Sequence, residues 1–498
     1  MGQNITINPI TRLEGHGKIE IFLDEKGFVQ DAYWQVVEMR GFERFVVGRP
    51  VEEMPRIMPN ICGVCPSPHN IAATKAVDNV FGVSPTPAAE LIRRLHLNAF
   101  LAEDHYVHFY FLSSPDFILG PNADPAIRNI LGVVDKMGID VGRKVIEIRK
   151  KVRSIIRLIA SKPPHPESGL PGGCSRGITE AERVKIKEIA YDNLEFAKFS
   201  IGLFKDLALK NKEFSELIAN PAYSLNVNNL CMVNGQNQLD FYGDTQNTMR
   251  ITGNSQNQEI DRFAAKDYVN HIGEWVEPWT YIRFTFAKKL GWTGLEEGNN
   301  TGMLRVGPLA RFNAVDGMIT TLAQIEHQEM LKTLGGKPVN QTLAYHWARL
   351  IEALQASESM VEIAENPMLT SKDIRNMNFN MQKEGIGAIE AARGTLLHHF
   401  KTDEKGFITA ANLLVATQHN AGPICASITK AAKAFVKGPD IREGFLNQVE
   451  MAFRAYDPCL SCSTHAIGGG LNLSINIRNH KQEILRTFNL TQRKNTTL

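Results

Sequence analysis

Two Cys-x-x-Cys pairs, one near each end of the sequence, constrain this 498-residue chain more than any other feature. The first pair, in NICGVCPSPH, is Cys62 and Cys65, and the second, in DPCLSCSTH, is Cys459 and Cys462. The other three cysteines stand alone: Cys174, Cys231 and Cys425. An odd count without a visible secretory signal indicates reduced thiols. Paired thiols in a reducing compartment more often bind a metal or carry out redox chemistry.

Spacing alone leaves three interpretations of the pairs open: a structural four-cysteine zinc site, a redox-active metal site, and core thiols without a metal. Structural zinc sites normally use pairs about 12 to 20 residues apart, because the metal folds a small module. Here 394 positions separate Cys65 from Cys459. A chain of this length with 43% hydrophobic residues needs no metal to build a core. The separation therefore favours a functional metal held between distant segments.

The segment after the first pair, PSPHNIAATKAVDNVFG, predicts a helix with Ser67 at the N-cap and Gly82 at the stop. Free N–H groups and the positive end of the helix dipole favour thiolates at Cys62 and Cys65. Thiolate is the ligand form of cysteine, and four soft thiolates favour nickel, zinc, copper(I) or iron over magnesium.

Composition excludes several classes of protein. Charge is balanced, with 55 Lys and Arg against 53 Asp and Glu, so no nucleic-acid footprint is expected. No apolar run reaches the roughly 18 residues that a membrane span needs, so none is expected. The first residues lack a basic start followed by an apolar stretch, and we therefore expect a cytoplasmic chain.

The pattern along the chain is mainly helical. Residues 1–48 predict a β-rich lobe, residues 49–465 a helical core with β insertions at about 215–310, and residues 466–498 a C-terminal extension. Long helical stretches are expected at 87–113, 125–161, 179–211, 316–334, 341–365 and 440–458. The last begins at a predicted capping box of Asp440 and Glu443.

Seven segments, in order along the chain, resemble the large subunit of nickel–iron hydrogenases. They are TRLEGHGKIEI (11–21), RGFERFVVGRP (40–50), NICGVCPSPHNIAATKA (60–76), EDHYVHFY (103–110), VGPLARFN (306–313), EAARGTLLHHF (390–400) and DPCLSCSTH (457–465). The best fit is to the soluble cytoplasmic branch that does not reduce deazaflavin. The resemblance implies an α+β, mainly α fold, in which small β-containing lobes surround a central bundle of long helices.

The resemblance also implies a buried nickel held by four thiolates. By motif position, Cys62 and Cys459 are its terminal ligands, and Cys65 and Cys462 are bridges to an iron that carries carbon monoxide and cyanide. Dihydrogen would then be split into hydride and proton, and a nearby base would take the proton. Cys459 and Arg393 are the candidates for that base, and Cys459 is favoured because arginine rarely loses its proton.

Further residues acquire roles from their place in the motifs. Glu14 resembles the first carboxylate of a proton relay. Asp104, Arg393 and Asp457 match a polar canopy over the metals, where two carboxylates flank one guanidinium. Without the motifs, Glu14 would be a surface or structural glutamate, and Asp104 would form an ordinary i,i+4 pair with His108 on a helix.

Three more polar residues belong to the implied site. His69 is expected to donate a hydrogen bond to a bridging sulfur. Glu43 and His465 resemble ligands of a magnesium or similar divalent ion, although an exposed glutamate without a metal is the ordinary alternative for Glu43.

The tail of 33 residues after His465 has two interpretations. In this family a dedicated maturation protease commonly cuts after that histidine once nickel is inserted. The alternative is a permanent C-terminal strand, since LNLSINI (471–477) alternates apolar and polar residues.

The resemblance implies partners as well. An iron–sulfur small subunit is required, because the four motif cysteines are already used and the other three are scattered. Flavin or heterodisulfide-reductase subunits would then carry the electrons onward. Two rival classes remain: a non-enzymatic assembly scaffold with structural zinc, and a complex I-type quinone-site subunit, which would lack the paired cysteines.

Overall fold

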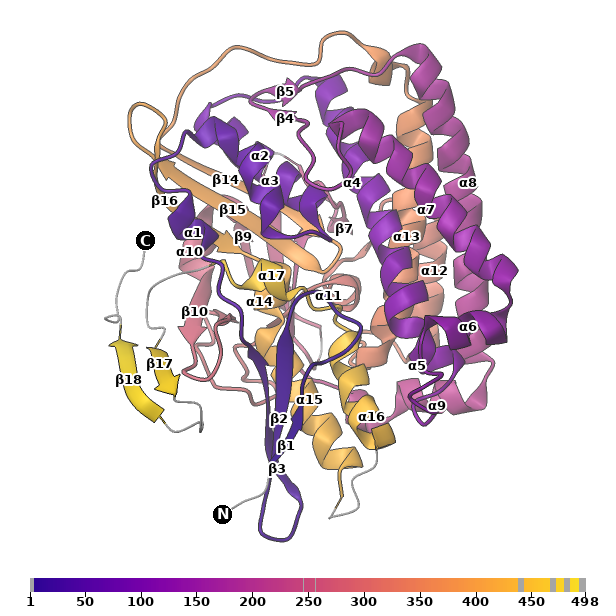
Figure 1. The fold of residues 1–498 in the computed structure, drawn as a ribbon. Coiled ribbons are helices and arrows are strands. Elements are labelled where there is room, and N and C mark those ends of the chain that lie inside the picture. Colours follow the sequence, from indigo (N-terminus) through magenta and orange to yellow (C-terminus); the bar gives the residue numbers. More distant parts are fainter. Residues whose placement is uncertain are drawn as a thin grey trace.

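The chain folds into long helices on one side and small sheets on the other, with short helices between them (Figure 1). In this computed structural model the described residues are 4–244, 246–255, 257–437, 443–465, 472–478 and 484–491. Among the described residues, no helix combines the length and the hydrophobicity that a membrane span requires. The architecture is α+β and mainly helical, as the sequence predicted.

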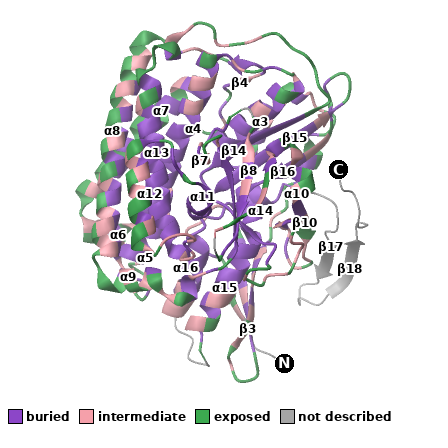
Figure 2. Cartoon of the chain, turned by 180° about the vertical axis from the view of Figure 1, so that it is seen from behind, coloured by how far each residue is buried: buried purple, intermediate pink, exposed green. Residues whose placement is uncertain are grey.

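Five helices form the bundle: α4 (Pro87–Val107), α7 (Ile139–Ala160), α8 (Glu180–Phe204), α12 (Thr321–Thr333) and α13 (Tyr345–Glu365). α13 packs against α4, α8 and α12, and it is buried along almost its whole length (Figure 2). α7 instead buries one stripe, which contains Val145, Ile148, Val152, Ile155 and Ile159. Residues three or four apart share a helix face, so α7 is an outer helix and α13 the central one.

The prediction of one helical stretch at 125–161 is wrong in one respect, because the structure has two helices there. α6 (Ile130–Met137) ends at Gly138, which has a φ of 88°, and α7 starts at the next residue. A left-handed φ costs glycine little and other residues more, so Gly138 permits the break. The helix predicted at 440–458 is α16 (Glu443–Arg454). Asp440 of its predicted capping box lies outside the described residues.

Two three-stranded antiparallel sheets flank the centre of the molecule. The first consists of β1 (Asn4–Ile7), β2 (Gly17–Leu23) and β3 (Val29–Val36), and the second of β14 (Glu384–Ala391), β15 (Gly394–Thr402) and β16 (Ile408–Leu414). A four-stranded sheet has the order β12 (Leu304–Arg305), β6 (Asn228–Val233), β8 (Thr248–Thr252) and β9 (Glu259–Ala264). The division of the chain at residues 48 and 465 stays a prediction.

α3 (Pro66–Val80) lies directly on β14 and positions the first cysteine pair. Glycine makes this close approach possible, since a Cβ on Gly387 would lie 2.1 Å from the carbonyl oxygen of Ala72. The predicted N-cap is wrong: Cys65 holds that position and Ser67 lies inside the helix. Ser67 is buried, and its hydroxyl forms a 2.8 Å hydrogen bond with His96 Nε2 instead of capping the helix.

Short helices bring the C-terminal motif to the same place. α14 (Ala416–His419), α15 (Ala421–Phe435) and α17 (Leu460–Ser463) follow the second sheet. A parallel β-bridge joins Glu14 to Cys459, so the motif around Glu14 meets the second cysteine pair beside α17. The strand predicted at 471–477 is confirmed as β17 (Asn472–Arg478), which pairs with β18 (Ile484–Thr491). The other residues of the tail lie outside the described part.

Candidate metal centre

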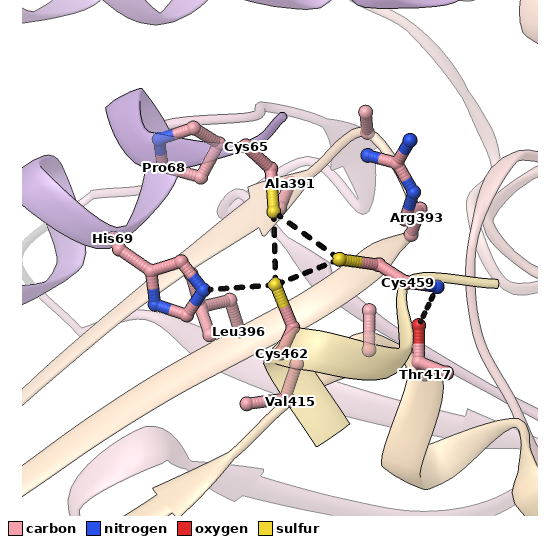
Figure 3. Close-up of a pocket in the computed structure, with 12 residues that line it drawn as sticks. Cys65, Pro68, His69, Ala391, Arg393, Leu396, Val415, Thr417, Cys459 and Cys462 are labelled. Carbon is pink, nitrogen blue, oxygen red and sulfur yellow. Dashed lines mark hydrogen bonds between the residues drawn. The ribbon is translucent and has the colours of Figure 1, made fainter. Parts of the chain in front are cut away.

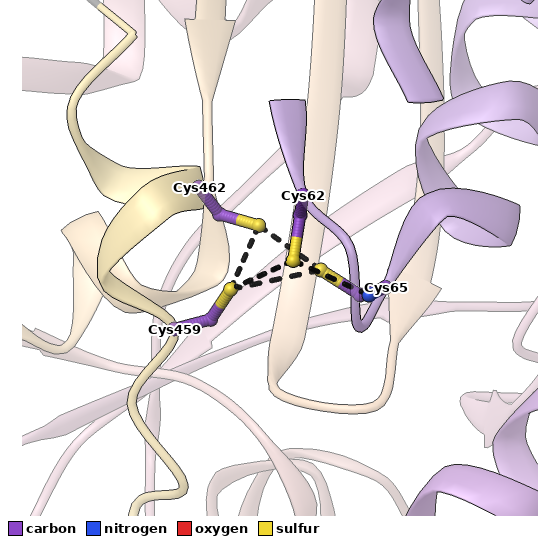
Figure 4. A group of neighbouring side chains, drawn as sticks. All are labelled: Cys62, Cys65, Cys459 and Cys462. Carbon is purple, nitrogen blue, oxygen red and sulfur yellow. Dashed lines mark hydrogen bonds between the residues drawn. The ribbon is translucent and has the colours of Figure 1, made fainter. Parts of the chain in front are cut away.

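Four cysteine sulfurs from opposite ends of the chain meet in one buried cluster (Figure 4). Cys459 Sγ lies 3.3 Å from Cys62 Sγ, 3.7 Å from Cys65 Sγ and 2.9 Å from Cys462 Sγ. Cys65 and Cys462 are 3.0 Å apart, and all four sulfurs lie within 4.8 Å of one another. All four cysteines are free, and these separations exceed the roughly 2.05 Å of a disulfide.

The local backbone presents each sulfur to the cluster. Cys65 is the N-cap of α3 and Cys459 is the N-cap of α17. The backbone N–H groups of Val64 and Cys65 point to Cys62 Sγ at 3.2 and 3.3 Å. N–H groups directed at sulfur stabilise a thiolate, the form that binds metals.

The electrostatics of the cluster require a cation when all four thiols are ionised. Hydrogen bonds from Cys459 and the other sulfurs lower the pKa of Cys62 well below its ordinary value. Burial, together with the sulfurs of Cys62 and Cys65, raises the pKa of Cys459 and Cys462 well above its ordinary value. Four buried negative charges this close repel one another unless a metal lies among them. A donor set of four soft thiolates fits nickel and iron, and by itself it fits zinc equally well.

Glu14 contacts the cluster directly, as its place in the motif led us to expect. Its Oε2 atom lies 3.0 Å from Cys459 Sγ and accepts a 3.1 Å hydrogen bond from the backbone N–H of Ser461. The backbone carbonyl of Glu14 accepts a further bond from the N–H of Leu460 at 3.1 Å. The side chain is half-buried, so it lies between Cys459 and the outside of the molecule.

The three residues of the expected canopy form one ion-paired group. Arg393 Nη1 lies 3.1 Å from Asp104 Oδ2, and Nη2 lies 3.0 Å from Asp457 Oδ2. Arg393 Nε also donates a 2.8 Å hydrogen bond to the backbone carbonyl of Asp457. Burial alone would lower the pKa of Arg393, but the two carboxylates raise it well above its ordinary value.

The alternative for Asp104, an i,i+4 pair with His108, is wrong. Asp104 pairs with Arg393, whereas His108 Nε2 donates a 2.9 Å hydrogen bond to the backbone carbonyl of Arg454.

Burial raises the pKa of Asp457 to about 7 even though Arg393 favours its ionised form.

His69 faces the cluster from the first turn of α3, and a second histidine stands behind it. His69 Nε2 lies 3.4 Å from Cys462 Sγ (Figure 3), and His69 Nδ1 lies 3.0 Å from His398 Nε2. Burial lowers the pKa of His69 to about 4. The sequence analysis missed His398, although it lies in the EAARGTLLHHF segment on a strand whose alternate residues share a face.

Glu43 and His465 meet away from the sulfurs. His465 Nδ1 lies 3.0 Å from Glu43 Oε1, and His465 Nε2 donates to Gln418 Oε1 at 3.0 Å. Glu43 also accepts a 2.8 Å hydrogen bond from the backbone N–H of Leu413. Both side chains are buried, which excludes the exposed-glutamate alternative. Gln418 is another residue that the sequence analysis missed.

A small cavity adjoins the cluster, between α3, the β14–β15 turn, α14 and α17 (Figure 3). Ala391, Ala392 and Leu396 give it apolar walls, and Arg393 lies at one side. Thr417, also missed by the sequence analysis, accepts a 3.0 Å hydrogen bond from the backbone N–H of Cys459. Three of the four cluster cysteines, Cys65, Cys459 and Cys462, line this cavity.

Comparison with known proteins identifies close relatives. The profile of the family described as nickel-dependent hydrogenase matches residues 40–126 and 143–465, and a HoxL-like profile matches residues 4–39. The chain is 44% identical over 487 residues to an F420-non-reducing hydrogenase iron-sulfur subunit of Archaeoglobus profundus, covering 98% of this chain and 99% of that protein.

Two further similarities extend to other members of the group. The chain is 35% identical to the NAD-reducing hydrogenase HoxS subunit beta of Cupriavidus necator, over 94% of this chain and 96% of that one. Its fold matches a crystal structure of an NAD+-reducing [NiFe]-hydrogenase in the H2-reduced state, with a TM-score of 0.87 and 36% identity. That match covers 93% of this chain and 99% of the other.

Proposed function

We propose roles for the cysteines of the cluster, starting from the family of this chain. The chain belongs to the nickel-dependent hydrogenase family and is the catalytic subunit of a nickel–iron hydrogenase. One observation carries the assignment: sulfurs separated by almost the whole sequence lie in mutual contact. Cys62 and Cys459 would hold the nickel alone, and Cys65 and Cys462 would be shared between the nickel and the iron. The carbon monoxide and cyanide of that iron would lie on the side of the adjoining cavity, which Cys65 and Cys462 line.

The chain's own residues move the proton. When bound, the metals supply the Lewis acidity and electron-accepting capacity for heterolytic cleavage of dihydrogen. Cys459 takes up the proton and passes it to Glu14, since Glu14 Oε2 lies within hydrogen-bond distance of its sulfur. Arg393 is the weaker candidate for the base, because its two carboxylate partners hold it in the protonated form.

The canopy orients groups over the cluster and keeps bulk water away. Asp104 and Asp457 together hold the guanidinium of Arg393 in one position, and all three side chains are buried. A buried arginine held between two carboxylates has little freedom to move, so it presents a fixed positive charge to the metal ligands.

We assign the Glu43–His465 pair to a magnesium or similar divalent ion. Glu43 and Gln418 offer oxygen ligands, and His465 offers its ring nitrogens, with Nδ1 at 3.0 Å from Glu43 Oε1 and Nε2 at 3.0 Å from Gln418 Oε1. Such an ion would tie the start of the chain to the residue after which the tail begins. Calorimetric titration of the purified complex with magnesium chloride, with Glu43→Gln as the comparison, tests this assignment.

Electrons leave through a partner protein. The three cysteines outside the cluster are scattered, so this chain has no residues for an iron–sulfur cluster of its own. Val64, which lies between Cys62 and Cys65, is 39% exposed. We propose that an iron–sulfur small subunit covers the surface around Val64, and that flavin or heterodisulfide-reductase subunits follow it in a cytoplasmic complex. We also propose that a maturation protease removes residues 466–498.

Metal analysis of the purified complex tests the central assignment. About one nickel and one iron per chain are expected, because the donor set is complete for such a pair. Cys462→Ala should lose both metals, whereas Cys425→Ala, which removes an equally buried thiol outside the cluster, should retain them. Zinc as the sole metal would overturn the assignment in favour of the scaffold, an alternative that the family relationship does not favour. The quinone-site protein is likewise not favoured.

A further inference from the structure

We propose that His398 is a positioning residue that determines which ring nitrogen of His69 carries the proton, so that His69 donates a hydrogen bond to the Cys462 sulfur. This inference rests on the proposed function, in which Cys462 is a metal-bound thiolate. His398 is buried and contacts His69 instead of the sulfurs or the canopy, and the inference gives it a role in the site.

The two histidines form a chain that ends on the bridging sulfur. His69 Nε2 is 3.4 Å from Cys462 Sγ, and His69 Nδ1 is 3.0 Å from His398 Nε2. The two rings are inclined by 39°, with their centroids 5.2 Å apart. His69 is 1% exposed and His398 is fully buried, so water does not compete for these nitrogens.

A contact between two ring nitrogens requires one N–H donor and one bare acceptor. In the first arrangement, His398 Nε2–H donates to His69 Nδ1, and the proton of neutral His69 sits on Nε2, facing Cys462. In the second, His69 Nδ1–H donates to His398, and the bare Nε2 of His69 faces the sulfur. A lone pair directed at a thiolate is repulsive, so a metal-bound Cys462 favours the first arrangement.

The other ring nitrogen of His398, Nδ1, independently favours the first arrangement. Within the described part of the chain, His398 Nδ1 has no hydrogen-bond partner. In the first arrangement this atom is a bare acceptor. In the second it carries a proton, and a buried N–H without an acceptor is rarer in folded proteins than an under-satisfied acceptor. The contact with Cys462 at one end of the histidine pair and the unpartnered Nδ1 of His398 at the other therefore favour the same tautomers.

The sheet holds His398 in place. It lies in β15 between Gly387 of β14 and Leu413 of β16, and Leu396 on the same face of the strand lines the cavity by the cluster. His399, its neighbour, points to the opposite face, where its Nδ1 lies 2.9 Å from the Tyr268 hydroxyl. The chain thus provides a matched control histidine one residue away.

A charge-assisted hydrogen bond draws electron density from the sulfur that accepts it. Less density would then reach an iron held by that sulfur, and the reduction potential of the centre would be higher. Removing the donor at position 398 should act in the opposite direction. It should lower both the carbon monoxide stretching frequency of the iron and the midpoint potential of the nickel.

The experiment uses the complete enzyme complex with three substitutions. His398→Leu removes the donor, His398→Gln retains an N–H at similar reach, and His399→Leu is the control. We expect all three variants to keep the wild-type nickel and iron content. His398→Leu should lower the carbonyl stretching frequency and the midpoint potential, and His398→Gln should bring both values back toward wild type. His399→Leu should show the wild-type frequency and potential. A His398→Leu enzyme with wild-type values, or a His398→Gln enzyme shifted equally, would overturn the inference.

A neutron crystal structure of the wild-type complex in D2O decides the question without any variant. Deuterium is expected on Nε2 of both His398 and His69, and deuterium on Nδ1 of His69 would contradict the inference. This measurement also separates the inference from the proposed function. A wild-type enzyme without carbonyl bands would refute the proposed iron ligands, while the deuterium positions would still report the tautomers.

Discussion

Replacing Glu14 by glutamine tests the proposed proton route at its first step. The substitution keeps the size of the side chain and leaves an amide oxygen to accept the 3.1 Å hydrogen bond from the Ser461 N–H. What it removes is the only titratable oxygen at 3.0 Å from Cys459 Sγ among the described contacts of that sulfur. Exchanging one charged acceptor for a neutral one should change the unfolding free energy by only about 1 kcal/mol.

The effect on proton transfer should be far larger. A positioned acid–base group contributes about 100- to 10,000-fold to a rate, which corresponds to about 3–5 kcal/mol of activation free energy. Exchange of deuterium gas with water protons, followed by mass spectrometry, should therefore slow by at least about 100-fold. Interconversion of para- and ortho-hydrogen, which needs no exchange with solvent, should continue, because the cysteine cluster is untouched.

Glu20→Gln is the control for this experiment. Glu20 lies in the same N-terminal sheet, where its carboxylate pairs with Lys18 at 2.9 Å, away from the cluster. It should exchange at the wild-type rate. A Glu14→Gln enzyme with wild-type nickel and iron content and an unchanged exchange rate would refute Glu14 as the relay.

Three further predictions concern the canopy, the core and the tail. Arg393→Lys exchanges a planar fork for a point charge and leaves one buried carboxylate poorly paired, so thermal unfolding should show a loss of about 1–3 kcal/mol. Asp116 is buried, which by itself would raise its pKa, but its ion pairs, chiefly with Arg454, hold the pKa below its ordinary value. Its stabilisation is therefore present above about pH 4, the unfolded-state pKa, and is lost as the pH falls through the lower folded-state value. Asp116→Asn should cost about 3–5 kcal/mol in denaturant unfolding at pH 7, and the cost should shrink in acid. For the tail, intact-mass spectrometry of active enzyme should find a chain that ends at His465, and a full-length active chain would contradict removal of residues 466–498.

Local sequence signals predicted those parts of the fold that depend on near neighbours. The strand at 18–23 and the helices that became α4, α8 and α13 follow from periodicity over a few turns. The break at Gly138 was missed, because a glycine inside an apolar pattern is compatible with a continuing helix. The N-cap at Cys65 was also missed, since Ser67 is the better capping residue and only its burial against His96 removes it from that role.

The residues of the candidate site also fall into two groups, those that the sequence predicted and those that it did not. The residues in the recognised motifs could be named from the sequence, and the structure brings Glu14, Cys459, Arg393 and Asp104 into the contacts described above. His398, Gln418 and Thr417 could not be named, because each acts through a partner tens or hundreds of positions away. Strand alternation shows which face His398 occupies, but not that α3 covers that face with His69.

The sequence by itself determined the chemical identity of the donors: two pairs of thiols, each next to the start of a short or long helix, and the charged residues around them. Tertiary structure alone decided that both pairs surround the same point, that Cys62 receives two backbone N–H groups, and that a second histidine stands behind His69. The physical reason is that side-chain type and local backbone preference are properties of a few adjacent residues. Contact between residues 62 and 459 depends instead on how every sheet and helix between them packs.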